Sequence, residues 1–91
     1  MATFFVYLII SNNKKKKISY VGYTKDLKKR VQLHNDSKGA KFTKGRKWKL
    51  IYYKRYFSKK KAMREEYKLK NNYKLRNYIK KKNENIYFTS F

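Results

Sequence analysis

The chain has 91 residues, which is room for one small domain with a single modest core. Its 27 Lys and Arg against 5 Asp and Glu give a formal net charge of +22, which favours a polyanionic partner, nucleic acid first. The absence of cysteine excludes disulfides, zinc modules, iron–sulfur clusters and thiol nucleophiles, and the few acids make any metal site sparse. An aromatic content of 19% argues against a disordered basic tail.

The first two elements are predicted to be an antiparallel hairpin. Residues 3–10 (TFFVYLII) are apolar on both faces, which indicates a central strand, and the run is too short to cross a membrane. After a turn with a run of lysines, residues 18–23 (ISYVGY) form the second strand. Tyr7 and Tyr20 share a face only if paired residue numbers have an odd sum, such as 27, and we expect such a register.

A helix is predicted next, from Lys25 to about Asn35, with Thr24 as its cap. Its apolar stripe carries two polar groups, because Arg30 and His34 fall on or beside the same face. These two residues are therefore not simply solvent-facing. For His34, a helix histidine with a satisfied hydrogen bond is the alternative to a functional role.

The rest of the chain is predicted as a polar loop (36–47), a strand (48–57), a helix (59–70, capped by Ser58) and a last helix from Tyr73 to 80–82. The last nine residues, 83–91, are left open between a short extended piece and a loose end. The sequence thus predicts one domain over 1–91, with a core over 3–71 and a C-terminal helix and tail over 72–91. Its fold class is α/β (α+β): a small three-stranded, mainly antiparallel sheet flanked by helices.

Glu66 is the acidic residue that the pattern turns inward. Ala62, Glu66, Leu69 and Tyr73 follow the spacing of a buried helix face, whereas Glu65 is rotated toward water. Buried carboxylates are paired with cations or bind metals, so an ion pair and a divalent ion are both open. A magnesium ion needs only one or two protein carboxylates.

Taken in chain order, five short motifs resemble the GIY-YIG nuclease family: Val6-Tyr7, Tyr20-Val21-Gly22, Arg30, His34 and Glu66. The resemblance runs from residue 4 to about 71. It is especially similar to the catalytic domain of the structure-selective endonucleases that cut branched DNA and of UvrC, and to stand-alone single-domain relatives. The sequence departs from the family in lacking the glycine of the first motif and in having valine for isoleucine in the second. Asn71 and Asn72 both lie near the family's supporting asparagine, and neither can be chosen.

The resemblance implies a metal-dependent endonuclease that hydrolyses phosphodiester bonds in branched or distorted DNA, with roles in repair and recombination. Glu66 would bind one Mg²⁺ or Mn²⁺, and Arg30 would hold the nonbridging phosphate oxygens. Tyr20 would take the proton of the attacking water, while Tyr7 and His34 orient that water or share the proton. Whether Tyr20 or His34 is the final acceptor stays open. Taken singly, a strand tyrosine is more often a packing residue.

The basic surface is expected to contact phosphates without reading bases. The residues assigned to nucleic-acid binding are Gly22, Lys25, Lys29, Lys38, Lys41, Lys44 and Arg46. The glycine would let a phosphate approach the backbone, unless it only marks a turn. Tyr23, Phe42 or Trp48 could stack on unpaired bases, although Trp48 begins a strand and is expected to be buried.

A rival hypothesis is a noncatalytic basic nucleic-acid-binding protein that retains the fold, since such a protein needs the charge but not the site. A membrane-surface protein is disfavoured, because no helix is strongly amphipathic with lysine and tryptophan. A protein partner or a homodimer is left open. The absence of cysteine and of a secretion signal indicates an intracellular location, without distinguishing nucleus from cytoplasm.

Overall fold

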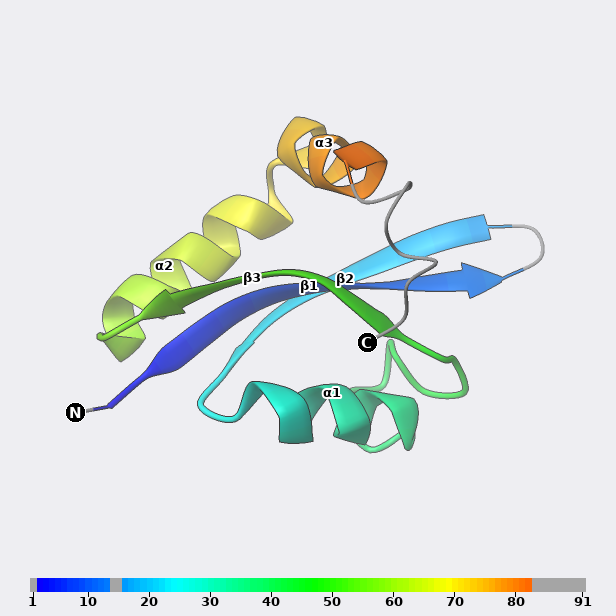
Figure 1. Cartoon of the computed structure of the whole chain (residues 1–91), viewed down its shortest axis with the longest axis horizontal. Coiled ribbons are helices and arrows are strands. Elements are labelled where there is room, and N and C mark those ends of the chain that lie inside the picture. Colours follow the sequence, from blue (N-terminus) through cyan, green and yellow to red (C-terminus); the bar gives the residue numbers. More distant parts are fainter. Residues whose placement is uncertain (1, 14–15, 83–91) are drawn as a thin grey trace.

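A computed structural model of the chain describes residues 2–13 and 16–82 (Figure 1). Its elements follow the predicted order, and the α/β fold class is confirmed. The bounds are β1 (Phe4–Asn13), β2 (Lys16–Thr24), α1 (Leu27–Asn35), β3 (Lys49–Tyr56), α2 (Lys59–Lys70) and α3 (Tyr73–Lys82). No helix in the described ranges is long and apolar enough to cross a membrane.

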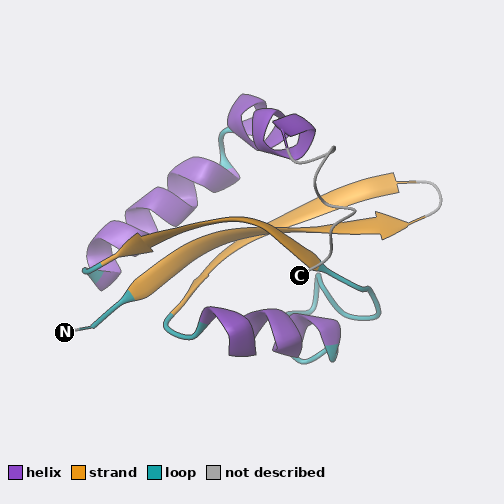
Figure 2. Ribbon diagram, viewed as in Figure 1, coloured by secondary structure: helices purple, strands orange, loops and turns teal. Residues whose placement is uncertain are grey.

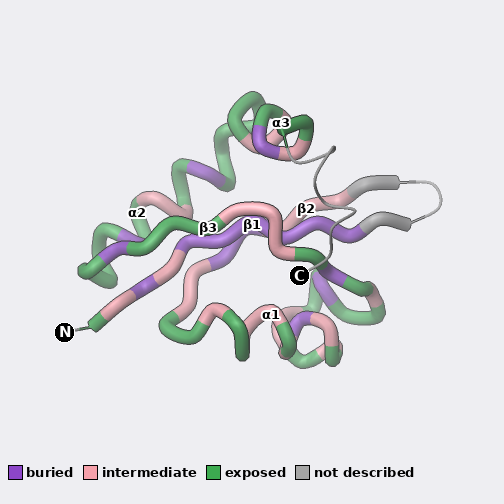
Figure 3. The backbone as a smooth tube through the Cα atoms, in the orientation of Figure 1, coloured by how far each residue is buried: buried purple, intermediate pink, exposed green. Residues whose placement is uncertain are grey.

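The three strands form one antiparallel sheet in the order β2-β1-β3. The first strand is therefore central, as its two apolar faces predicted. The helices cover both faces of this sheet, because α1 lies on one side and α2 and α3 lie on the other (Figure 2). As a result β1 is buried along most of its length (Figure 3).

The alternation of side chains along β1 divides the core into two layers. Val6 and Leu8 point toward α2 and α3, where they pack with Ala62 and Leu69. Tyr7, by contrast, belongs to the layer that faces α1. The second layer also contains Ile9 and Trp48, with Tyr20, Leu27 and Val31 packed against them.

The register of the hairpin confirms the predicted parity. Tyr7 lies opposite Gly22, and Ile9 lies opposite Tyr20. The paired numbers have an odd sum, two larger than the sum of 27 given as the example. Both tyrosines therefore point to the α1 side of the sheet.

The start of α1 differs from the prediction. Asp26 is its N-cap, with a carboxylate oxygen that accepts from the Lys29 backbone N–H at 3.1 Å. Thr24 instead accepts from the Asp26 N–H at 3.2 Å and shapes the turn before the helix. Aspartate and threonine are both good caps, and the extended backbone of Asp26 (φ −128°, ψ 94°) decides between them. The predicted Ser58 cap of α2 is confirmed, because its hydroxyl accepts from the Lys61 N–H at 3.2 Å.

The inner stripe of α2 is shorter than predicted. Ala62 and Leu69 are buried, and the Glu66 side chain is only 18% exposed, but Tyr73 is 66% exposed. The helical period fails there because α2 ends at Lys70, before α3 begins in a new direction. The Glu65 side chain is 29% exposed rather than fully turned to water.

The predicted last helix is confirmed as α3, and residues 83–91 lie outside the described part of the chain. The polar loop between α1 and β3 also forms as expected. At the end of α1 the chain turns through Ser37, which has a φ of 61°. Two backbone bonds close this turn, from Lys38 N to Leu33 O and from Ser37 N to His34 O. Together they make a Schellman motif, in which Ser37 takes the place usually held by glycine.

Candidate active site

Tyr7 and His34 form the buried centre of the site. Tyr7 lies in the middle of β1 and His34 in the last turn of α1, and both are 0% exposed. The Tyr7 hydroxyl lies 2.7 Å from His34 Nε2. One residue from the sheet and one from the helix thus meet in a direct hydrogen bond.

Thr43, in the loop after α1, decides which way this bond runs. Its hydroxyl donates its only proton to the Ala40 carbonyl at 3.1 Å, and its oxygen lies 2.8 Å from His34 Nδ1. Nδ1 must therefore carry the hydrogen and donate to Thr43. In this neutral tautomer Nε2 is bare, so it accepts the proton of the Tyr7 hydroxyl.

Both groups are held neutral. Burial, helped by the positive charge of Arg30, lowers the pKa of His34 to about 4. Burial raises the pKa of Tyr7 to about 12, although hydrogen bonding and attraction from Arg30 oppose the shift. Near neutral pH the pair is therefore a phenol that donates to an unprotonated imidazole.

Arg30 lies one turn before His34 on α1 and reaches the same phenol. Its Nε is buried and has no hydrogen-bond partner among the described residues. Buried guanidinium donors are normally satisfied, because an unpaired one loses its hydration. Arg30 therefore has an unused donor, as a group that binds an anion requires.

Glu66 comes from α2, on the other side of the sheet, yet its charge reaches the same point. After burial and the charge of Tyr20, the negative charge of Glu66 is a further cause that raises the Tyr7 pKa. Its carboxylate also lies 3.6 Å from Lys70 Nζ, in an i,i+4 pair. The lysine pairing that the sequence left open is thus present, together with an electrostatic effect on the phenol.

Tyr20 completes the group from β2. Its ring centre lies 5.0 Å from that of His34, with an angle of 60° between the planes. The structure therefore brings together four of the five residues assigned to catalysis, Tyr7, Tyr20, Arg30 and His34. The fifth, Glu66, acts on the same phenol through its charge.

Two glycines make room for the central pair. A Cβ atom at Gly22 would lie 2.6 Å from Tyr7 Cζ, and one at Gly39 would lie 2.8 Å from His34 Cγ. The space above Gly22 is thus filled by the Tyr7 ring. A contact between a phosphate and the backbone of Gly22 stays a prediction.

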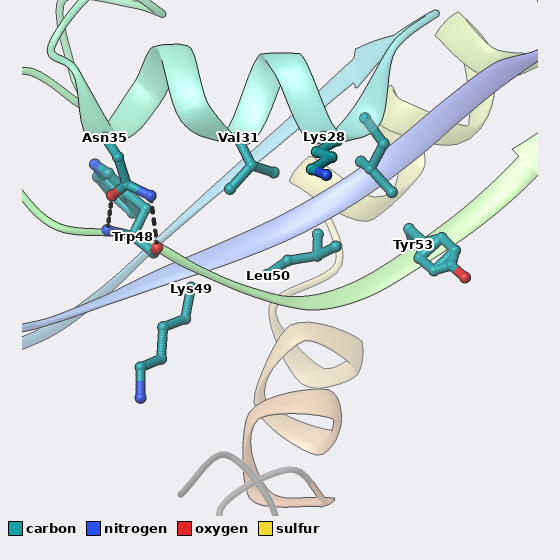
Figure 4. Close-up of a pocket in the computed structure, with 8 residues that line it drawn as sticks. Lys28, Val31, Asn35, Trp48, Lys49, Leu50 and Tyr53 are labelled. Carbon is teal, nitrogen blue, oxygen red and sulfur yellow. Dashed lines mark hydrogen bonds between the residues drawn. The ribbon is translucent and has the colours of Figure 1, made fainter. Parts of the chain in front are cut away.

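Sequence reasoning missed the residues that fix the loop. Asn35 accepts from Trp48 N at 2.5 Å and donates to Trp48 O at 3.1 Å, which ties the end of α1 to the start of β3 (Figure 4). The same residues border a largely apolar groove of about 760 Å³ between these elements. Thr43 is 0% exposed and was also missed. The only signal for either was a polar residue beside a glycine-containing loop.

The expected basic contacts lie mostly on α1 and the following loop. Lys29, Lys38, Lys41 and Lys44 are exposed and Arg46 is partly exposed, as binding to phosphate requires. Lys25 is exposed in the turn between β2 and α1, and its Nζ lies 5.5 Å from the centre of the Phe4 ring. The structure does not test these contacts, which stay predictions.

A metal could be held only by a sparse set of ligands. No group of three or more His, Asp or Glu side chains suited to a metal occurs within 2–13 and 16–82. A single inward carboxylate fits an ion such as Mg²⁺, which completes its shell with water and phosphate oxygens. Among the residues that the structure describes, Glu66 is the acid whose charge reaches this site.

In this basic α/β domain a buried phenol and a buried imidazole lie beside a half-buried phenol and a half-buried guanidinium, and the charge of one carboxylate acts on them. Such a set of groups fits a nuclease. Residues 3–83 match the model of the GIY-YIG catalytic domain. The chain belongs to the GIY-YIG family, a family of nucleases that act on DNA and generally use a divalent metal. The predicted resemblance is thereby confirmed.

Several bacterial proteins are similar in sequence. UPF0213 protein OB0043 of Oceanobacillus iheyensis is 46% identical over 52 residues, which are 56% of this chain and 60% of that protein. UPF0213 protein YazA of Bacillus subtilis is 52% identical over 52 residues, which are 56% of this chain and 52% of that protein. UPF0213 protein SERP0126 of Staphylococcus epidermidis is 42% identical over 67 residues, covering 72% and 78% of the two chains.

The names of these relatives state no activity. The match spans only 52% to 60% of the length of the first relatives. No solved structure gave a significant match.

Proposed function

We propose that the chain is a metal-dependent DNA endonuclease, in one catalytic domain, that hydrolyses phosphodiester bonds in branched or otherwise distorted DNA. The observation that carries this proposal is the convergence on one buried phenol. His34 accepts from Tyr7, Arg30 attracts it, and the charge of Glu66 reaches it from the other side of the sheet. A binding surface alone needs no such buried arrangement.

Arg30 would hold the nonbridging oxygens of the scissile phosphate. Its unpaired Nε supports this role, because a planar guanidinium makes two charge-assisted bonds to phosphate. These bonds strengthen as negative charge builds up on the oxygens during attack. The positive charge that lowers the His34 pKa is then partly compensated by the bound substrate.

Glu66 would hold one Mg²⁺ or Mn²⁺, in exchange for its pairing with Lys70. A bound ion of this kind neutralises the phosphate and the departing 3′ oxygen. Lys70, once released from Glu66, would contact the DNA backbone beside this phosphate. One carboxylate suits either metal, so the proposal includes both ions.

Tyr20 would take the proton from the attacking water. Burial raises the pKa of Tyr7 to about 12, so this phenol is neutral near pH 7, and it donates its proton to His34. Tyr7 can therefore orient the water through its oxygen while His34 holds the phenol in place. His34, with a bare Nε2 behind Tyr7, is the alternative acceptor through that hydrogen bond.

One observation favours the noncatalytic alternative. Lys70 neutralises Glu66 at 3.6 Å, which is the usual fate of an inward carboxylate on a basic protein. In that case the charge of +22 would serve DNA binding alone. A DNA substrate and the absence of cysteine support an intracellular place of action for either function, and distorted DNA would connect it to repair and recombination.

The test uses labelled flap, junction and linear duplex DNA, with Mg²⁺ or with EDTA. We expect cuts in flap and junction that need the metal, a loss of at least about 100-fold in Glu66→Gln and Arg30→Ala, and little change in binding. Glu65→Gln is the matched control, because the adjacent glutamate pairs with Lys68 on another side of α2. If the native protein binds but never cuts, the enzyme proposal fails. Equal cutting of linear duplex would contradict the selectivity.

A further inference from the structure

A small pocket of about 270 Å³ lies beside the candidate active site, at the free edge of β2. Its walls come from three parts of the chain: Ser19, Tyr20 and Val21 of β2, Phe42 of the loop, and Lys70 and Arg76 of the two later helices. Tyr20 belongs to both the pocket and the site, and Lys70 pairs with Glu66. Whatever enters the pocket is therefore a direct neighbour of the group that would be cut.

Phe42 is the outermost ring of a stack that is anchored in the core. Its ring lies 6.0 Å from that of Tyr20 with an angle of 23°, and Tyr20 in turn meets Trp48 edge-on at 6.5 Å. Trp48 is 4% exposed and donates from Nε1 to the Thr43 carbonyl at 2.9 Å, so the inner end of the stack is fixed. Phe42 itself is 58% exposed, although one side is covered by Tyr20.

Another part of the pocket wall, formed by Lys70 and Arg76, is positively charged and held in position. Arg76 Nη1 donates to the Leu69 carbonyl at 2.9 Å and to the Lys70 carbonyl, at the C-terminal end of α2. The same guanidinium lies 5.9 Å from the centre of the Tyr73 ring. A fixed cation and an exposed ring in one pocket present the two surfaces that a nucleotide needs, a flat apolar one for the base and a positive one for the phosphate.

We propose that this pocket binds an unpaired nucleotide next to the scissile phosphate, with its base stacked on Phe42 and its phosphate against Lys70 and Arg76. The proposal rests on the proposed nuclease function and names its substrate feature. A paired base inside a duplex has both faces covered by its neighbours, so it cannot stack on the ring. The preference for distorted DNA would then be a requirement for a free base at one position.

The experiment measures binding in EDTA, so that no cleavage occurs. Three labelled duplexes are compared by fluorescence anisotropy: one with a single bulged adenine, one with an abasic site in place of that adenine, and one fully paired. Stacking on an aromatic side chain predicts that the native protein binds the adenine bulge about 5- to 150-fold more tightly than the abasic bulge.

Variants at Phe42 separate base stacking from nonspecific binding to DNA. We expect Phe42→Ala and Phe42→Leu to bind the two bulges equally, and Phe42→Trp to restore the preference. Phe57→Ala is the matched control, because Phe57 is 63% exposed but belongs to a different pocket, after β3. Circular dichroism checks the fold of each variant, and the exposed position of Phe42 makes the fold insensitive to its replacement.

The proposal is overturned if the native protein does not distinguish adenine from abasic bulges, or if the leucine variant keeps the distinction. Failure of the nuclease function has a different signature, because binding is read without metal. A protein that prefers the adenine bulge yet never cuts with Mg²⁺ would retain the pocket and lose only the enzyme.

Discussion

Thr43→Val removes the hydroxyl that fixes the His34 tautomer while keeping nearly the same volume. Nδ1–H of His34, which is 0% exposed, then has no acceptor, because its 2.8 Å bond to Thr43 is lost. The Ala40 carbonyl keeps a partner, since the backbone N–H of residue 43 also donates to it at 3.2 Å. The cost is therefore concentrated at one unpaired buried donor, about 1–3 kcal/mol of the free energy of unfolding.

Urea unfolding measures this loss, and a cost of about 2 kcal/mol lowers the midpoint by about 1 M at a typical slope. Imidazole ¹⁵N shifts give the second readout, because without Thr43 the other tautomer becomes accessible and Tyr7 no longer has a fixed acceptor. We expect cleavage to fall by about tenfold or more. Thr43→Ser keeps the hydroxyl and is the control. If the valine variant matches serine in stability and keeps the tautomer, the assignment of the hydrogen bonds is wrong.

Three further predictions concern His34, Gly22 and the hydrogen bonds between Asn35 and Trp48. The pKa of His34 is about 4 in the folded protein and 6.5 in the unfolded chain, so between these values only the unfolded chain binds the proton. The stabilisation that results from neutral His34 is fully present above pH 6.5 and is lost as the pH falls toward 4. The difference in unfolding free energy between native and His34→Gln proteins, measured across this range, should shrink by about 3 kcal/mol. Gly22→Ala should destabilise the fold by about 1–3 kcal/mol in urea titrations, since its Cβ would lie 2.6 Å from Tyr7 Cζ; an unchanged midpoint would contradict this packing. Asn35→Ala leaves two polar groups of Trp48 without their partner, so thermal unfolding should occur several degrees lower, whereas an unchanged melting temperature would show that the clamp carries no energy.

The strands and their faces could be predicted because alternation is a strong local signal. The apolar faces of β1 indicated a central strand, and the parity rule placed Tyr7 and Tyr20 on one side of the sheet. The inward position of Glu66 followed from helical spacing. These features depend on near neighbours in sequence, whose geometry is nearly fixed.

The remaining features depend on contacts that spacing does not encode. Thr43 lies in a loop without periodicity, and its role exists only because His34 is brought to it by the turn at Ser37. Tyr73 is exposed because α2 ends at Lys70 and α3 begins at Tyr73, a break that the regular spacing of apolar residues did not reveal. The effect of the Glu66 charge on Tyr7 acts between a helix on one side of the sheet and a side chain on the other, so no local pattern could show it.

The clamp between Asn35 and Trp48 has a consequence for how this protein could change. Residues 36–47 leave and re-enter the fold at a single tied neck, and Phe42 and Thr43 hold the outer part of this loop against Tyr20 and His34. Lys41 and Lys44 flank these two residues with exposed side chains, so replacing either lysine would change the charge of the loop and leave the hydrogen bonds of His34 in place. Substrate choice and chemical machinery can thus diversify at different rates in proteins built this way.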